Sequence, residues 1–329
     1  MENHFRSYTD LIEVLTDNNL KVKDKHLAQR LIQEKTYYSL INGFKSPFID
    51  NTTNKFKPGT SFEDIYFQYN LEQQLKNILL EYLLRIETRY KEVIGHLLGE
   101  RYGDTFESYM DARNFSGSRH WVLSEIKYFT TERDKILRKQ NITPTKYYYN
   151  NKGFLPPWIF LHDLTFTPIN SIFKMLKPNL KKKVISYMLY DSIEFGSLFD
   201  ESAVEMFNYS MALIVEFRNL LAHNSRIYRK KADLHERINY PTLTLFIDDS
   251  CINEKEFNNG LGNSDFFSLL CLIKVLSNQS DGSEFVATIA AIFDDYLAAN
   301  PELTRTYFNS LNLPANFISR LITLNNKIQ

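Results

Sequence analysis

One apolar repeat, between Ile65 and Gly99, constrains the fold of this chain more than any other feature. Large apolar side chains recur along it at helical spacing, at Ile65, Leu75, Leu79, Leu83, Ile86, Tyr90 and Ile94. Ser61 precedes the repeat and Asp64 follows three positions later, which is the pattern of a capping box. A repeat of this length predicts one long helix with its apolar face against the core.

Helical spacing continues through most of the remaining chain, so the sequence predicts an all-α fold. We expect shorter helices over residues 7–15, 24–32, 105–112, 119–139, 159–164, 168–176, 180–189, 264–276 and 283–299, and a motif-bearing helix from Asp200 or Ser202. Residues 36–43 are interpreted as a last helical turn closed by Gly43, and residues 140–158 as a connection rich in Tyr and Pro. Residues 242–246 are the one candidate strand.

The most distinctive chemical cluster of the chain is formed by Arg218, Asn219 and His223. It closes an apolar helical segment over residues 201–217, and a basic tail over residues 226–231 follows it. A guanidinium keeps its charge at every physiological pH, whereas an imidazole titrates near neutrality. This combination is suited to chemistry on a phosphodiester.

Helix geometry limits how Arg218 and His223 can cooperate. Five residues advance about 500° around a regular helix, which leaves the two side chains about 140° apart. Either the helix ends near His223, where Asn224 and Ser225 favour a terminus, or a second copy of the chain completes the site. A dimer would place two Arg and two His around one cleft.

RNA transesterification fits these groups. One imidazole would take the proton of a ribose 2′-hydroxyl, a second would protonate the leaving 5′-oxygen, and the guanidinium would stabilise the charged phosphate. We expect no metal and no cofactor, because the sequence has no cluster of carboxylate, Cys or His ligands. As a bare pattern Arg-x4-His is weak, and a local role for both residues at a helix end stays open.

Five short sequence blocks follow one another along the chain: YYSLINGF at 37–44, GTSF at 59–62, RIE at 85–87, PPW at 156–158 and RNLLAHNSR at 218–226. Together they resemble the Abi-like abortive-infection proteins of the AbiD/AbiF type, which belong to the HEPN superfamily of helical ribonucleases and nucleotide-binding domains. The chain departs from that pattern at Thr167, where glycine is usual, and at Glu72 and Lys76, where Asp and Arg are usual.

The resemblance implies a HEPN-like helical bundle over residues 61–240, with an N-terminal helical segment (1–60) and a C-terminal helical extension (241–329). It implies a toxin-like, phage-defence endoribonuclease that acts as a homodimer on RNA, restrained by an RNA or protein antitoxin. The alternative is a catalytically silent HEPN-type module that binds RNA or nucleotides.

Carried over by position, Arg218 and His223 would be the catalytic pair. Asn219 would orient the arginine or a phosphate, and Arg226 would contact the substrate. Two interpretations of Glu87 stay open: it orients Arg218, or it pairs with a neighbouring Arg of its own helix.

Composition limits which binding partners and which cellular location the chain can have. The formal net charge is zero, so the chain is no bulk polycation, although residues 130–185 hold 11 Lys and Arg against three acids. This basic region is interpreted either as a track for a nucleic-acid backbone or as a solvated helix face.

Two cysteines without metal spacing, no signal-like N-terminus and no membrane-length apolar run predict a cytoplasmic protein without membrane contact. Residues 147–149, three tyrosines beside lysines, could stack on single-stranded RNA or pack within the fold.

Overall fold

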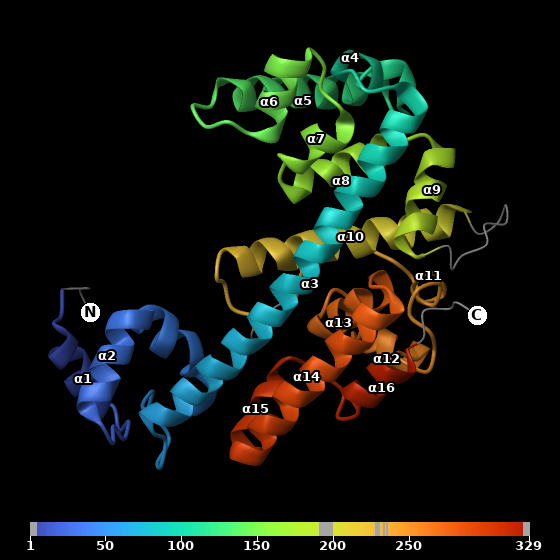
Figure 1. Ribbon diagram of the computed structural model, residues 1–329. Helices are drawn as coiled ribbons and strands as arrows, with labels where there is room; N and C mark the ends of the chain where they lie inside the picture. The colour runs from blue at the N-terminus through green and yellow to red at the C-terminus, as the bar shows by residue number, and fades with distance from the viewer. Residues whose placement is uncertain (1–4, 191–199, 228–230, 233, 235, 325–329) are drawn as a thin grey trace.

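The computed structural model describes residues 5–190, 200–227, 231–232, 234 and 236–324 (Figure 1). Within these residues the protein is all-α, and extended segments pair only through isolated bridges. The helices are α1 (Tyr8–Asp17), α2 (Lys25–Lys35), η1 (Tyr38–Asn42), η2 (Ser46–Phe48), α3 (Phe62–Tyr102), α4 (Phe106–Tyr109), η3 (Ala112–Asn114), α5 (Arg119–Arg138), α6 (Pro144–Lys152), α7 (Pro157–His162), α8 (Phe166–Met175), α9 (Pro178–Met188), α10 (Asp200–Ala222), α11 (Tyr240–Leu243), α12 (Glu254–Asn258), α13 (Phe266–Leu276), α14 (Gln279–Ala299), α15 (Pro301–Ser310) and α16 (Phe317–Thr323).

Helix α3 is the long helix that the apolar repeat predicts, and it runs for 41 residues. Its N-terminus is a capping box in which the Ser61 side chain accepts a hydrogen bond from the Asp64 amide and the Asp64 carboxylate accepts one from the Ser61 amide. Figure 1 shows α3 crossing the molecule, with α1 and α2 at its N-terminal end, α4–α7 at its C-terminal end and α13–α15 alongside. Most of the fold therefore packs on this one helix.

Helix α7 approaches α3 closely at two glycines. A Cβ atom added at Gly95 would lie 2.7 Å from the Cα of Trp158, and one added at Gly99 would lie 2.7 Å from the Trp158 ring. Because real Cβ atoms do not approach other atoms so closely, the absence of side chains at these positions permits the contact.

The C-terminal helices form an apolar group against α3 and α10. Every residue of α13 is buried, and α13 contacts α3, α10, α14 and α16. Asp265 caps α13 and accepts hydrogen bonds from the amides of Ser268 and Gly262, each at 2.8 Å. A helix that is apolar all round needs neighbours on every side, which these contacts supply.

Three local expectations were wrong. Residues 242–246 form no strand, because Asn239 caps α11 and Pro241 occupies its first turn, so Thr242 and Leu243 end a short helix and residues 244–246 form a turn. Gly43 does not close a turn, since its φ of −63° is helical; its missing side chain instead leaves room for the Arg226 stem, 3.4 Å from an added Cβ. The connection over 140–158 contains α6, which Thr143 caps.

Among the described helices, none combines the length and the hydropathy that a bilayer crossing requires.

Candidate active site

Helix α10 carries the Arg/His cluster across α3 and ends in an ordered cap. Its last residue is Ala222, and Asn224 adopts a left-handed conformation with φ of 53°. The amide of Ser225 donates to the carbonyl of Leu220, and that of Asn224 to Leu221, both at 2.9 Å. These two bonds make a Schellman motif with Asn in the place of the usual glycine. The expected helix end near His223 is therefore confirmed, and the cap fixes the direction in which the chain leaves.

Arg218 is held by a buried ionic group on α3. Its Nε donates to Glu87 Oε2 at 2.7 Å, while the other oxygen of Glu87 lies 2.8 Å from Lys91 Nζ. Lys91 also donates to the carbonyl of Leu164 at 2.6 Å. Because Glu87 and Lys91 are almost fully buried, this network fixes the guanidinium in place. Glu87 thus orients Arg218 and also pairs within its own helix, with Lys91 rather than with the neighbouring arginines.

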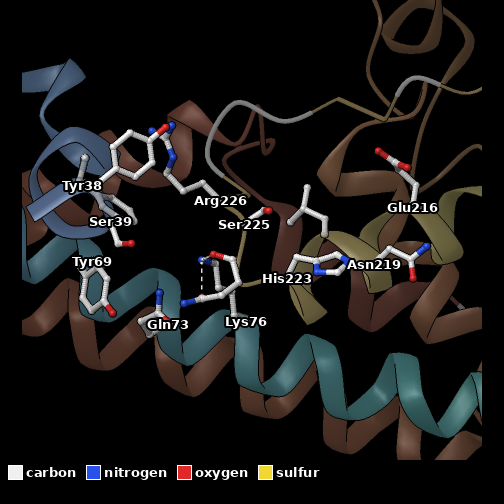
Figure 2. A pocket seen from close by; sticks show the side chains of 13 residues that line it. Tyr38, Ser39, Tyr69, Gln73, Lys76, Glu216, Asn219, His223, Ser225 and Arg226 are labelled. Carbon is white, nitrogen blue, oxygen red and sulfur yellow. Dashed lines mark hydrogen bonds between the residues drawn. The ribbon is translucent and has the colours of Figure 1, made fainter. Parts of the chain in front are cut away.

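Asn219 lies between the arginine and an open cavity. Its Oδ1 accepts a long hydrogen bond of 3.4 Å from Arg218 Nη1. The same residue lines a cavity of about 720 Å³ together with His223 and Arg226. Figure 2 shows His223 on the wall opposite Tyr38, with α3 forming the floor between them.

Arg226 is fixed at the edge of this cavity by the N-terminal region. Its Nη1 donates to the carbonyl of Gly43 at 2.5 Å, which joins the loop after α10 to the end of η1. Arg226 and Tyr38 both line the cavity (Figure 2). A partly exposed guanidinium at a cavity edge is positioned to bind a phosphate.

A buried carboxylate, Glu72 on α3, supports the loop that follows His223. One of its oxygens accepts from the Ile227 amide at 3.2 Å and lies 3.1 Å from Lys76 Nζ; the other accepts from the hydroxyl of Tyr307 on α15 at 2.9 Å. Lys76 in turn contacts both oxygens of Asn224 at 3.4 Å. Residues from α3, the loop and the C-terminal region thus share one polar network, which we call the Glu72 network.

Of the five residues expected at the site, the structure brings Asn219, His223 and Arg226 to one cavity. Arg218 and Glu87 are paired with each other next to Asn219, but neither lines that cavity. The joining of Arg218 and His223 across two copies of the chain stays a prediction.

Sequence reasoning missed most of the cavity floor. Glu72 and Lys76 are spaced four residues apart on α3, so they carried a signal for a buried pair, but no role was assigned to them. Tyr307 gave no signal, because nothing in a single sequence pairs it with Glu72. The tyrosines of α6 lie at the far end of α3, and the basic residues of this region are partly paired, as Arg133 is with Glu107 and Lys135 with Glu132.

Within the described residues, no group of three or more His, Cys, Asp or Glu side chains could hold a metal ion.

The family model of the Abi-like proteins matches residues 30–229 of the chain, which include η1, α3, the α10 motif and the loop after it. No curated protein and no solved structure matches the chain significantly.

Proposed function

The chain belongs to the Abi-like protein family, and from this premise we propose that it is an abortive-infection endoribonuclease of the HEPN superfamily and the AbiD/AbiF type. It acts in the cytoplasm on RNA, without a metal cofactor, in a site that two copies of the chain complete. An RNA or protein antitoxin restrains it.

The proposed reaction is a transesterification within the RNA strand. The His223 imidazole removes the proton of a ribose 2′-hydroxyl, and the oxygen attacks the adjacent phosphorus. The bond from phosphorus to the 5′-oxygen breaks, and a second imidazole, from the other copy, protonates the leaving oxygen. Arg218 stabilises the charge on the phosphate during the attack. The products are a 2′,3′-cyclic phosphate and a 5′-hydroxyl.

The observation that best supports this proposal is the way in which Arg218 is held. Glu87 and Asn219 occupy its Nε and Nη1, and the described residues offer no hydrogen bond to Nη2. The side chain is 22% exposed, so a phosphate can reach the remaining donors. A guanidinium fixed in this way stabilises charge in the transition state without reorganising.

A second candidate function, binding without catalysis, is favoured by one observation. The cavity that holds His223 is lined by Asn219 and Arg226 but not by Arg218. A single copy therefore offers cations and hydrogen-bond donors to RNA or a nucleotide, but not the catalytic pair.

The test is cleavage of end-labelled RNA by the purified full chain in the presence of EDTA, with mapping of both new ends. We expect cyclic-phosphate and 5′-hydroxyl ends that disappear in His223→Ala and in Arg218→Ala. His120→Ala, which changes an exposed histidine at the start of α5, is the matched control and should cleave normally.

RNA that is retained but uncut by the wild type would exclude the nuclease and favour the binding function. Cleavage that survives in His223→Ala would refute the proposed chemistry. Expression of the wild type and of Arg218→Ala in growing cells tests for toxicity, and material that co-purifies with Arg218→Ala would report an antitoxin.

A further inference from the structure

We propose that the cavity beside His223 holds one unpaired nucleobase of the RNA, the base next to the scissile phosphate. The site would then select single-stranded RNA and prefer certain bases at the cleavage position. The reference to a scissile phosphate rests on the proposed function, but the base-binding cavity can be tested without cleavage.

Tyr38 supplies a stacking surface at the cavity wall. It lies on η1 with 72% of its surface exposed, although its neighbours Leu40 and Ile41 are fully buried. The Tyr38 ring therefore contributes little to the core. Aromatic rings interleaved with cations are the usual platform for unpaired bases, and Arg226 lines the same cavity.

The cavity floor offers two side chains with hydrogen-bonding groups, those of Tyr69 and Gln73. Tyr69 is only 7% exposed, and its ring is held at 5.7 Å by the edge of Phe44 and at 6.3 Å by a stack on Tyr66. Its hydroxyl nevertheless has no hydrogen-bond partner among the described residues. The amide of Gln73, one turn further along α3, has none in that part of the chain either. Both groups line the cavity, so the edge of a bound base can form a hydrogen bond with each of them.

Size and charge also fit a nucleotide. A volume of about 720 Å³ lies within the roughly 300–1,000 Å³ of small-molecule sites. Among the described residues that line the cavity, Glu216 is the one acid, and Lys76 is paired with Glu72 behind the floor. Arg226 is therefore the cation at the cavity edge that would bind the phosphate of a nucleotide. Figure 2 shows Gln73 and Lys76 on the floor between the Tyr38 and His223 walls.

This arrangement predicts selection for single strands. Hydrogen bonds at the floor require a free base edge, and stacking on Tyr38 requires a free base face. In a duplex both are already engaged by the partner strand and by neighbouring bases. Loops and unpaired ends are therefore the substrate class that fits.

The test measures binding of short fluorescent RNAs in which every 2′-hydroxyl is methylated, so that no linkage can be cleaved. We expect Tyr38→Ala to weaken binding of a single strand by about five- to 150-fold, as the loss of one base stack does, while Tyr38→Phe binds as the wild type does. Gln73→Leu should change the ranking of oligonucleotides that differ only in one base. Tyr128→Ala, which removes another exposed tyrosine from α5 at the other end of α3, is the control.

Unchanged binding in Tyr38→Ala together with an unchanged base ranking in Gln73→Leu would overturn the proposal, as would equal binding of a duplex. Thermal melting of each variant excludes unfolding as the cause of a loss. If Tyr38→Ala weakens RNA binding but the wild-type protein cuts no RNA, the base-binding cavity is upheld and the nuclease is refuted.

Discussion

Tyr307→Phe tests whether the C-terminal helices support the loop that follows His223. The substitution keeps the ring, which is fully buried against Phe308, and removes only the hydroxyl that donates to Glu72 at 2.9 Å. Glu72 would retain the Ile227 amide and Lys76, but one of its oxygens would lose a donor inside the protein.

The size of the effect follows from the charge and burial of the acceptor. A hydrogen bond to a charged group contributes about 1.5–3 kcal/mol to stability. Both partners are inaccessible to solvent here, so no bulk water replaces the lost donor. We therefore expect the free energy of unfolding to fall by about 1.5–3 kcal/mol.

The assay is urea unfolding followed by circular dichroism, with Tyr109→Phe as the control. Tyr109 is also fully buried, but its hydroxyl has no hydrogen-bond partner among the residues that the structure describes. Removing an unsatisfied buried hydroxyl should leave stability unchanged or raise it by about 1 kcal/mol. The same chemical change is thus expected to lower stability at Tyr307 but not at Tyr109.

Equal effects of Tyr307→Phe and Tyr109→Phe would refute this reasoning, because the loss would then reflect the ring environment rather than the bond to Glu72. A clear loss of stability in Tyr307→Phe with an unaltered Asn224 side-chain amide signal in NMR spectra would also contradict the claim that the network reaches the loop.

Three further predictions concern local geometry. Gly95→Ala should destabilise the protein more than Gly99→Ala in thermal unfolding, because its new methyl meets the Trp158 backbone rather than a ring that can shift; equal losses would contradict this. Asn224→Ala should lower stability by about 1 kcal/mol and Asn224→Gly by less, since only glycine adopts the left-handed conformation freely; the reverse order would exclude strain at this cap. Burial raises the pKa of the Cys271 thiol, so little thiolate forms at neutral pH, and iodoacetamide should label this residue only as urea unfolds the chain; rapid labelling of the native protein would count against this burial.

Much of the fold could be predicted because it depends on local pattern. The apolar repeat after Ser61 predicted α3, and the capping box placed its start correctly. The expectation of a strand at 242–246 was wrong because it gave more weight to the alternation of Thr and Leu than to Asn239 and Pro241, which start a helix. Over such short segments, cap residues decide more than side-chain alternation does.

The site was predictable only where its residues are close in sequence. Asn219, His223 and Arg226 fall within one helix end, so their meeting at one cavity follows from local structure. The support of the loop after His223 depends on contacts between distant segments, such as Tyr307 with Glu72, and a single sequence has no local signal for them.

The hydrogen bonds of Glu72 have a consequence for the order in which parts of the protein fold during synthesis. During synthesis α3, which carries Glu72, emerges early, and the loop that contains Ile227 emerges much later. The hydroxyl that completes the hydrogen bonds of Glu72 belongs to Tyr307, which emerges later still. A nascent chain folds as its segments leave the ribosome. The loop after His223 consequently gains its full support only once Tyr307 has left the ribosome. A chain released before Tyr307 would leave the buried Glu72 carboxylate without one of its donors.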